Sequence, residues 1–283
     1  MPFVTVGAEN LAPIDLYYED HGTGQPVVLI HGFPFNGATW EKQVGPLLQA
    51  GYRTITYDRR GFGNSAQPST GYDYDTFAAD LDVLLTELNL TDVILVGHSM
   101  GTGEVTRYLG TYGSERISKA VLAAPLAPYL LKTADNPEGV EQSLFDGFKQ
   151  AIVADRFAYL TKFCDSFFNY PENRGKLVSE EAYRAHWDIG ARASAIGTLE
   201  CVDAWLTDFR GDLPRIDVPV QIIQGDQDQV LPYPKTGQRL QPMIADSRLV
   251  TLRGAPHGIP WTNAEEMNRA MLDFIGQPAM ARA

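Results

Sequence analysis

The residues at positions 97–101 form the pattern G-x-S-x-G, with Ser99 at its centre. An apolar run at 93–96 comes directly before it, and residues 102–109 after it have helical spacing without a proline. A serine in a tight turn between a buried strand and a helix is raised above the sheet, where the helix N-terminus favours negative charge. Glycine fits both flanking positions, because a side chain there would collide with neighbouring backbone. The pattern therefore predicts that Ser99 is a nucleophile.

A serine hydroxyl attacks well only when a base takes its proton, and in this arrangement the base comes later in the chain. Two histidines follow the nucleophile, His186 and His257. His257 lies in a turn-rich loop after the apolar run 248–252, which is expected to be the last strand. His186 falls in a helical stretch, and His21 falls in a turn, so we expect structural roles for both. His257 is therefore the predicted base.

Two aspartates, Asp226 and Asp228, follow the apolar run 218–224 and compete for the role of the acid that orients the base. Asp228 matches the pattern G-x-x-D-x-x-x-P within residues 225–232. Asp226 falls on the turn itself, where its carboxylate would accept hydrogen bonds from backbone amides. We predict Asp228 as the third member of the triad and keep Asp226 as the alternative.

Two backbone amides should stabilise the oxyanion of a tetrahedral intermediate, an effect of about 3–4 kcal/mol per donor in other enzymes. One is the amide of Met100, which follows the nucleophile. The other is expected in the loop after the apolar run 26–30, where the sequence reads His-Gly-Phe-Pro. Pro34 cannot donate and favours an extended residue before it, so Phe33 is the predicted second donor. We expect His31 to bond neighbouring backbone.

Apolar runs typical of strands alternate with helical segments along most of the chain. The expected strands cover residues 3–6, 14–20, 26–30, 52–57, 93–96, 117–124, 218–224 and 248–252. Such alternation predicts a mainly parallel sheet with helices on both faces. Between 126 and 214 the strand signals give way to helical ones. We therefore predict an α/β-hydrolase fold with an eight-stranded, mostly parallel sheet, a core of 1–125 and 215–283, and an inserted helical cap of 126–214.

Composition limits the alternatives. The 283 residues carry a net charge of −12, from 23 basic and 35 acidic residues, which disfavours nucleic acid or an anionic membrane as a partner. The chain has neither a membrane-length apolar stretch nor a secretory signal, so we expect a cytoplasmic protein without a membrane span. Its two cysteines, Cys164 and Cys201, are predicted to be buried thiols of the cap. No phosphate loop or H-E-x-x-H motif occurs, and we expect no metal and no organic cofactor.

Aromatic residues are frequent in the expected cap: Phe163, Phe167, Phe168, Tyr170, Trp187 and Trp205. For any single ring, packing of the cap onto the core is the preferred interpretation. As a set, these rings suggest a small apolar or aromatic acyl or alcohol group in the substrate.

Several longer sequence segments, in addition to the predicted triad, are typical of one family of enzymes. They cover residues 14–24, 57–63, 101–105 and 255–258, together with residues 261–262. With these strings the chain resembles the cofactor-free bacterial haloperoxidases, or perhydrolases, within the serine α/β-hydrolases. The resemblance implies hydrolysis of small esters. It also implies formation of a peracid from a carboxylic acid and hydrogen peroxide, and oxidation of halide by that peracid in solution.

Other activities on the same fold remain open. Epoxide hydrolases and haloalkane dehalogenases need a carboxylate where Ser99 stands, but a carbon–carbon hydrolase or a lactamase would use the same triad. A ligand-sensing hydrolase relative with slow turnover is an alternative from another class. The expected partners are a small ester or carboxylic acid, with hydrogen peroxide as a candidate co-substrate and a homo-oligomer as a further option.

Overall fold

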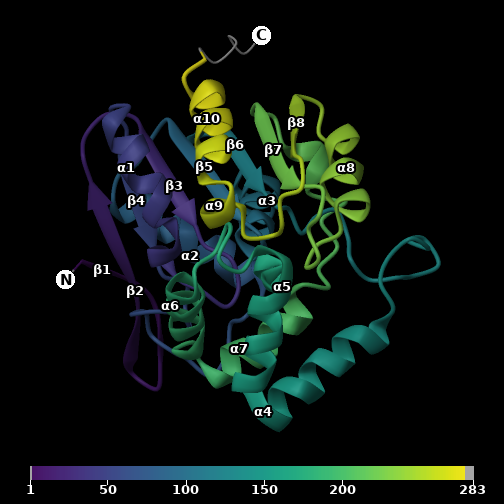
Figure 1. Cartoon of the computed structure of the whole chain (residues 1–283). Coiled ribbons are helices and arrows are strands. Elements are labelled where there is room, and N and C mark those ends of the chain that lie inside the picture. The colour runs from purple at the N-terminus through teal and green to yellow at the C-terminus, as the bar shows by residue number, and fades with distance from the viewer. Residues whose placement is uncertain (1, 278–283) are drawn as a thin grey trace.

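An eight-stranded sheet runs through the centre of the computed structural model, which describes residues 2–277 (Figure 1). Its strands are β1 (Phe3–Glu9), β2 (Ala12–His21), β3 (Pro26–Ile30), β4 (Arg53–Tyr57), β5 (Val93–His98), β6 (Ile117–Ala123), β7 (Val220–Gly225) and β8 (Ser247–Leu252). They are arranged in the order β1-β2-β4-β3-β5-β6-β7-β8. β2 pairs antiparallel with β1 and β4, and every other neighbouring pair is parallel. The predicted mostly parallel sheet is confirmed.

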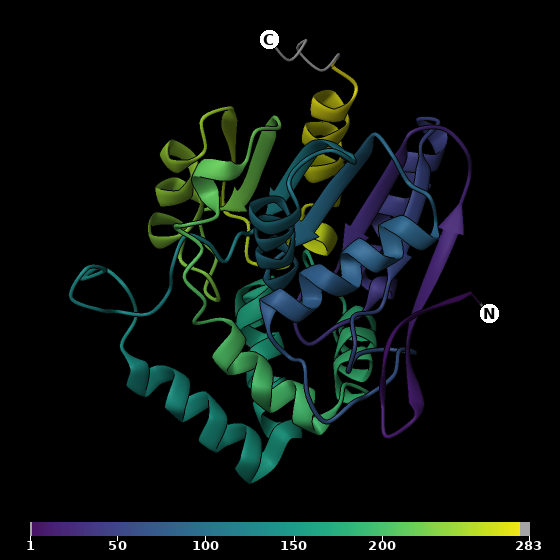
Figure 2. The ribbon, with the colours of Figure 1, turned by 180° about the vertical axis from the view of Figure 1, so that it is seen from behind.

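Helices cover both faces of this sheet (Figures 1 and 2). One face carries α1 (Glu41–Gln49), α9 (Ile259–Thr262) and α10 (Ala264–Ile275), and the other carries α2 (Tyr74–Glu87), α3 (Met100–Tyr112) and α8 (Gly237–Leu240). Successive side chains of a strand point to opposite faces, so one apolar run fills two cores. In β3, Leu29 joins the core with α10, whereas Val28 joins the core with α2.

A group of helices between β6 and β7 lies beyond the carboxyl ends of the parallel strands (Figure 1). This helical insertion consists of α4 (Gln142–Phe168), α5 (Tyr170–Asn173), α6 (Glu180–Ala191) and α7 (Ala195–Ala204). The backbone of α4 is interrupted at Asp155, whose carboxylate accepts the amides of Phe157 and Ala158 and so caps the second half of the helix. The division into a core and a separate cap of 126–214 stays a prediction.

The two cysteines lie inside the helical insertion, Cys164 on α4 and Cys201 on α7. Both thiols are free and fully buried, as predicted. Burial raises the pKa of Cys201 to about 12 and raises that of Cys164 further. Both sulfurs are therefore kept as thiols rather than thiolates.

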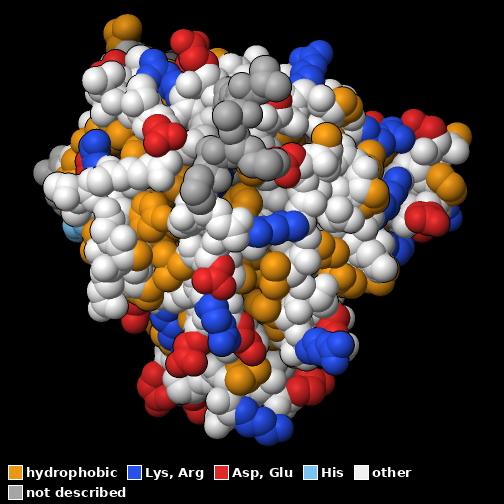
Figure 3. Space-filling view, turned by 90° about the horizontal axis from the view of Figure 1, so that it is seen from above, with side chains coloured by type: hydrophobic (Ala, Val, Ile, Leu, Met, Phe, Trp, Pro, Cys, Tyr) orange, Lys and Arg blue, Asp and Glu red, His pale blue; other side chains and the backbone are white. Residues whose placement is uncertain are grey.

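The surface seen from above, opposite the helical insertion, mixes acidic and basic side chains with apolar ones (Figure 3). No single charge dominates this face, although the chain as a whole has 35 acidic residues against 23 basic ones. In the described part of the chain, no helix combines the length and the apolar character of a membrane span.

Candidate active site

Ser99 occupies the sharp turn between β5 and α3. Its backbone has φ 54° and ψ −120°, a region that residues with a side chain rarely adopt. A Cβ atom added at Gly97 would lie 2.6 Å from the carbonyl oxygen of Gly101, and one added at Gly101 would collide with the carbonyl of Ile30. Both flanking positions therefore require glycine, as the sequence predicts.

The hydroxyl of Ser99 faces an imidazole and a carboxylate. Ser99 Oγ lies 2.8 Å from His257 Nε2, and His257 Nδ1 lies 2.7 Å from Asp228 Oδ2. All three residues are buried. They follow β5, β8 and β7, whose carboxyl ends meet at the same edge of the sheet. In the tautomer in which Nδ1–H donates to Asp228 Oδ2, Nε2 is free to accept the proton of the serine hydroxyl.

The two competing aspartates have different partners. Asp228 Oδ1 accepts the amides of Val230 at 2.9 Å and Leu231 at 2.8 Å, while its other oxygen faces the imidazole. Asp226 Oδ1 instead accepts the amide of Gly254 at 2.7 Å. Asp226 thus braces the loop after β7 against the loop after β8. Of the two aspartates, only Asp228 contacts the imidazole of His257.

Phe33 and Met100 border the same cavity as Ser99. Within residues 2–277, neither of their amides has a hydrogen-bond acceptor. Met100 is the first residue of α3, where a backbone N–H has no partner inside the helix. Free donors beside a helix N-terminus are suited to an oxygen that becomes negatively charged.

The cavity that reaches Ser99 has a volume of about 520 Å³. Apart from Ser99, its polar lining residues are Lys162, Ser166 and Gln229. Hydrocarbon and aromatic side chains form most of the wall: Leu126, Leu130, Val140, Leu144, Phe145, Phe148, Ala151, Tyr159, Phe163, Trp205, Val230, Leu231 and Pro232. The helical insertion contributes much of this wall. Such a cavity suits an apolar group of a small substrate.

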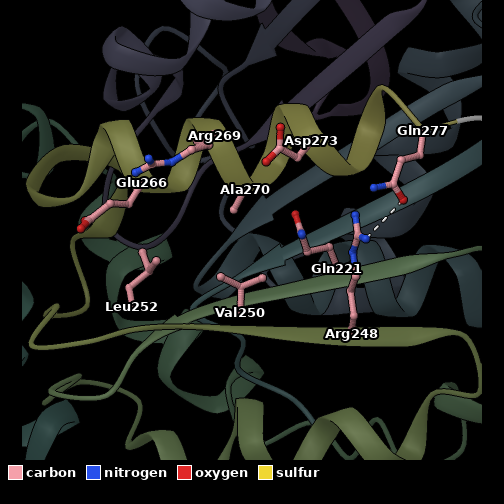
Figure 4. Close-up of a pocket in the computed structure, with 9 residues that line it drawn as sticks. All are labelled: Gln221, Arg248, Val250, Leu252, Glu266, Arg269, Ala270, Asp273 and Gln277. Carbon is pink, nitrogen blue, oxygen red and sulfur yellow. Dashed lines mark hydrogen bonds between the residues drawn. The ribbon is translucent and has the colours of Figure 1, made fainter.

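A second hollow, of about 530 Å³, lies between β8 and α10 (Figure 4). Its wall carries charges of both signs, on Arg248, Glu266, Arg269 and Asp273, but no serine, cysteine or histidine. It therefore lacks the nucleophile and base that the cavity at Ser99 contains. Among residues 2–277, no group of three or more His, Cys, Asp or Glu side chains is placed to hold a metal ion.

Three further histidines are buried and bound to backbone. His98 Nε2 lies 3.1 Å from the carbonyl oxygen of His257, and burial lowers the pKa of His98 to about 3. His31 lies 2.9 Å from the carbonyl oxygen of Gly32, and burial, aided by the nearby Arg59 charge, lowers its pKa well below the usual range. These two rings therefore stay neutral and support the loops of the site.

His186 on α6 packs between the helical insertion and the sheet domain, against the rings of Phe168 on α4, Phe35 after β3 and Trp261 on α9. Burial lowers its pKa, and its Nδ1 lies 2.8 Å from the carbonyl oxygen of Ala182. His186 is therefore a buried packing residue, in line with the structural role expected from the sequence. The contact of His98 with the loop of His257 was not predicted, because nothing in the local sequence indicates a partner 159 positions away.

Known proteins resemble this chain over nearly its whole length. Residues 25–264 match the model of the alpha/beta hydrolase fold family. A Synechocystis sp. protein named for the non-heme chloroperoxidases is 62% identical over 275 residues, covering 97% of this chain and 100% of the relative. The bifunctional esterase/perhydrolase DCH of Acinetobacter calcoaceticus is 34% identical, covering 93% of this chain and 96% of its own.

Among solved structures, the bromoperoxidase from Bacillus anthracis superposes with a TM-score of 0.93 at 48% identity, covering 98% of this chain and 99% of that one. The fold agrees with these likenesses. The chain therefore belongs to the α/β-hydrolases, in the group of non-heme haloperoxidases and perhydrolases.

Proposed function

We propose that this protein is a serine esterase that works through an acyl-enzyme, and that it also forms peracids from carboxylic acids and hydrogen peroxide. The observation that carries the proposal is the continuous contact from Asp228 through His257 to Ser99 at the floor of a mostly apolar cavity. The Acinetobacter relative is named a bifunctional esterase/perhydrolase, which supports the pairing of the two activities.

In the first step His257 accepts the proton of Ser99 while Oγ attacks the ester carbonyl. The amides of Phe33 and Met100 hold the resulting oxyanion. His257 then gives its proton to the departing alcohol, and the acyl group stays on Ser99. Asp228 keeps the imidazole in the tautomer that this exchange requires.

In the second step His257 activates the molecule that removes the acyl group. Attack by water gives the carboxylic acid and free Ser99. Attack by hydrogen peroxide gives the peracid, which leaves the site and oxidises halide to hypohalous acid while it is itself reduced to the carboxylic acid. We expect His257 to serve as the base for either nucleophile, because both present an O–H group to the same face of the acyl-enzyme.

We assign the stretch 126–214 to a cap that shapes the space for the acyl group. Its apolar side chains fill much of the wall opposite Ser99, including Phe145, Phe148 and Phe163. A volume of about 520 Å³ and a largely hydrocarbon lining favour small apolar or aromatic esters.

Paired assays on the wild type and Ser99→Ala test this function. We expect the wild type to hydrolyse p-nitrophenyl acetate and, with peroxide, to brominate monochlorodimedone in acetate but not in a non-carboxylate buffer. Loss of a serine nucleophile lowers kcat by about 10⁶-fold in a comparable enzyme, so Ser99→Ala should lose both activities while folding normally. Bromination at the wild-type rate by Ser99→Ala would contradict a shared site. Strong ester hydrolysis without bromination would leave an esterase only, and a few acyl transfers per molecule would favour a ligand-sensing role.

A further inference from the structure

Beneath the turn that carries Ser99, a cluster of polar side chains is enclosed in the protein. Glu104 is fully buried and Arg59 is 1% exposed. Arg59 Nε donates to Glu104 Oε2 at 2.8 Å, and the hydroxyl of Tyr57 donates to the other carboxylate oxygen. None of these three residues forms a hydrogen bond or an ion pair with Ser99 or His257, and the proposed acyl-transfer steps do not use them.

The same guanidinium also reaches the loop that carries Phe33. Arg59 Nη2 donates to the carbonyl oxygen of His31 at 3.1 Å, and the Arg59 amide donates to His31 Nε2 at 3.0 Å. The other ring nitrogen of His31 lies 2.9 Å from the carbonyl oxygen of Gly32. Arg59 and His31 together therefore hold the two residues that precede Phe33.

Glu104 belongs to α3, one helical turn after Met100. The start of this helix lies directly against the end of β3, where a Cβ atom on Gly101 would be 2.9 Å from the carbonyl oxygen of His31. Arg59 thus joins the two elements that supply the predicted oxyanion donors: α3 through Glu104, and the loop after β3 through His31.

Stability alone does not account for a charged pair in this position. Burial raises the pKa of Glu104, and the neighbouring Arg59 charge only opposes that shift. A buried ion pair is often no more stabilising than an apolar pair of the same volume, because both charges lose their hydration. The specific geometry that the pair imposes on its neighbours explains why two charges are buried at this cost.

We propose that Arg59 is a positioning residue for the reaction, which ties Glu104 on α3 to the carbonyl of His31 and so sets the spacing of the Met100 and Phe33 amides around the oxyanion. The inference rests on the proposed esterase function. Oxyanion donors act only when they are held close to their working positions, and displacements of about 1 Å can cost about 100-fold in rate.

The chain offers a matched control in the next residue. Arg60 also forms a buried pair, with Asp80 through two contacts of 2.6 Å, but donates no hydrogen bond to the loop at 31–33. Arg59→Lys and Arg60→Lys each keep a positive charge and each remove the planar fork that serves two acceptors at once. Both variants therefore disturb the geometry of a buried ion pair. Only Arg59→Lys also removes the side-chain hydrogen bond to the carbonyl oxygen of His31.

We expect Arg59→Lys to lower kcat for p-nitrophenyl acetate by about 10-fold or more, with KM within about 2-fold of the wild type. Arg60→Lys should keep kcat within about 2-fold of the wild type, even if its Tm falls by as much as the Tm of Arg59→Lys. If Arg59→Lys fails to fold, the apolar replacement Tyr57→Phe/Arg59→Met/Glu104→Met takes its place, and the same loss of kcat is expected. Wild-type kcat in either Arg59 variant, or equal kcat losses in Arg59→Lys and Arg60→Lys, would overturn the proposal.

A separate measurement distinguishes this failure from failure of the esterase proposal. A fluorophosphonate should label wild-type Ser99 covalently, which mass spectrometry of the peptide detects. If Ser99 is labelled and the Arg59 variants are fully active, only the positioning role is wrong. If Ser99 is not labelled and Ser99→Ala still turns over ester, the proposed function itself fails.

Discussion

The two sides of the cavity at Ser99 are built from different interactions. On the sheet side, contacts of 2.7–2.9 Å hold Ser99, His257 and Asp228 in place. On the side of the helical insertion, the wall consists mainly of hydrocarbon and aromatic surface. Hydrogen bonds are directional, whereas apolar contacts depend mostly on area and shape. The difference suggests that the sheet side sets the reaction, and that the insertion sets which substrates enter.

The largest expected effect on the sheet side comes from the two aspartates after β7. We expect Asp228→Asn to lower kcat by about 10⁴-fold, because an amide partner favours the wrong imidazole tautomer. The matched variant Asp226→Asn should stay within about 10-fold, since Asp226 bonds the Gly254 amide and not His257. Steady-state ester hydrolysis measures both. Similar losses of kcat in the two variants would show that the hydrogen-bond partners of Asp226 and Asp228 do not determine their roles in the reaction.

On the insertion side, we expect substitutions to change the preference among substrates rather than the reaction. Phe148 on α4 borders the cavity, whereas Phe157 on the same helix is 49% exposed and does not. Phe148→Ala should raise the ratio of kcat/KM for p-nitrophenyl octanoate over the acetate by about 10-fold, because a removed ring leaves room for a longer chain. Phe157→Ala should change that ratio by less than about 2-fold. If Phe148→Ala lowered kcat equally for all esters, the insertion would affect the reaction itself, and the proposed division between the two sides would be wrong.

The smallest expected effect is on stability and comes from His186 of the insertion. Because burial lowers the pKa of His186 in the folded state, the unfolded chain binds a proton below about pH 6.5 that the folded chain does not. The free energy of unfolding should therefore fall as the pH drops below this value, by up to about 1.4 kcal/mol per pH unit for this residue. Urea unfolding at several pH values should show a shallower slope for His186→Phe. An unchanged slope in His186→Phe would contradict this account.

The elements that carry the site were predictable because their signals are local. Apolar runs indicated the strands of the sheet, and the glycines around Ser99 indicated a turn that the structure contains. Asp226 and Asp228 were separable by their spacing alone, and their partners in the structure differ in the expected way.

Other features depend on contacts between distant parts of the chain. Arg59 and Glu104 lie 45 positions apart and meet only when α3 packs against the loop after β4. The motifs at 57–63 and 101–105 contain both residues, but a motif does not state which side chains will touch. The interruption of α4 at Asp155 was also not predicted, because an aspartate inside a long helical pattern is compatible with a continuous helix.

The buried thiols of Cys164 and Cys201 have a consequence for a protein that is proposed to take up peroxide. Peroxide oxidises the thiolate form of cysteine, and burial keeps both sulfurs protonated and out of contact with solvent. Self-inactivation by sulfenic acid formation should therefore be slow in the folded enzyme. Oxidation of these two cysteines would then follow unfolding, which exposes the thiols, and would not accompany each turnover.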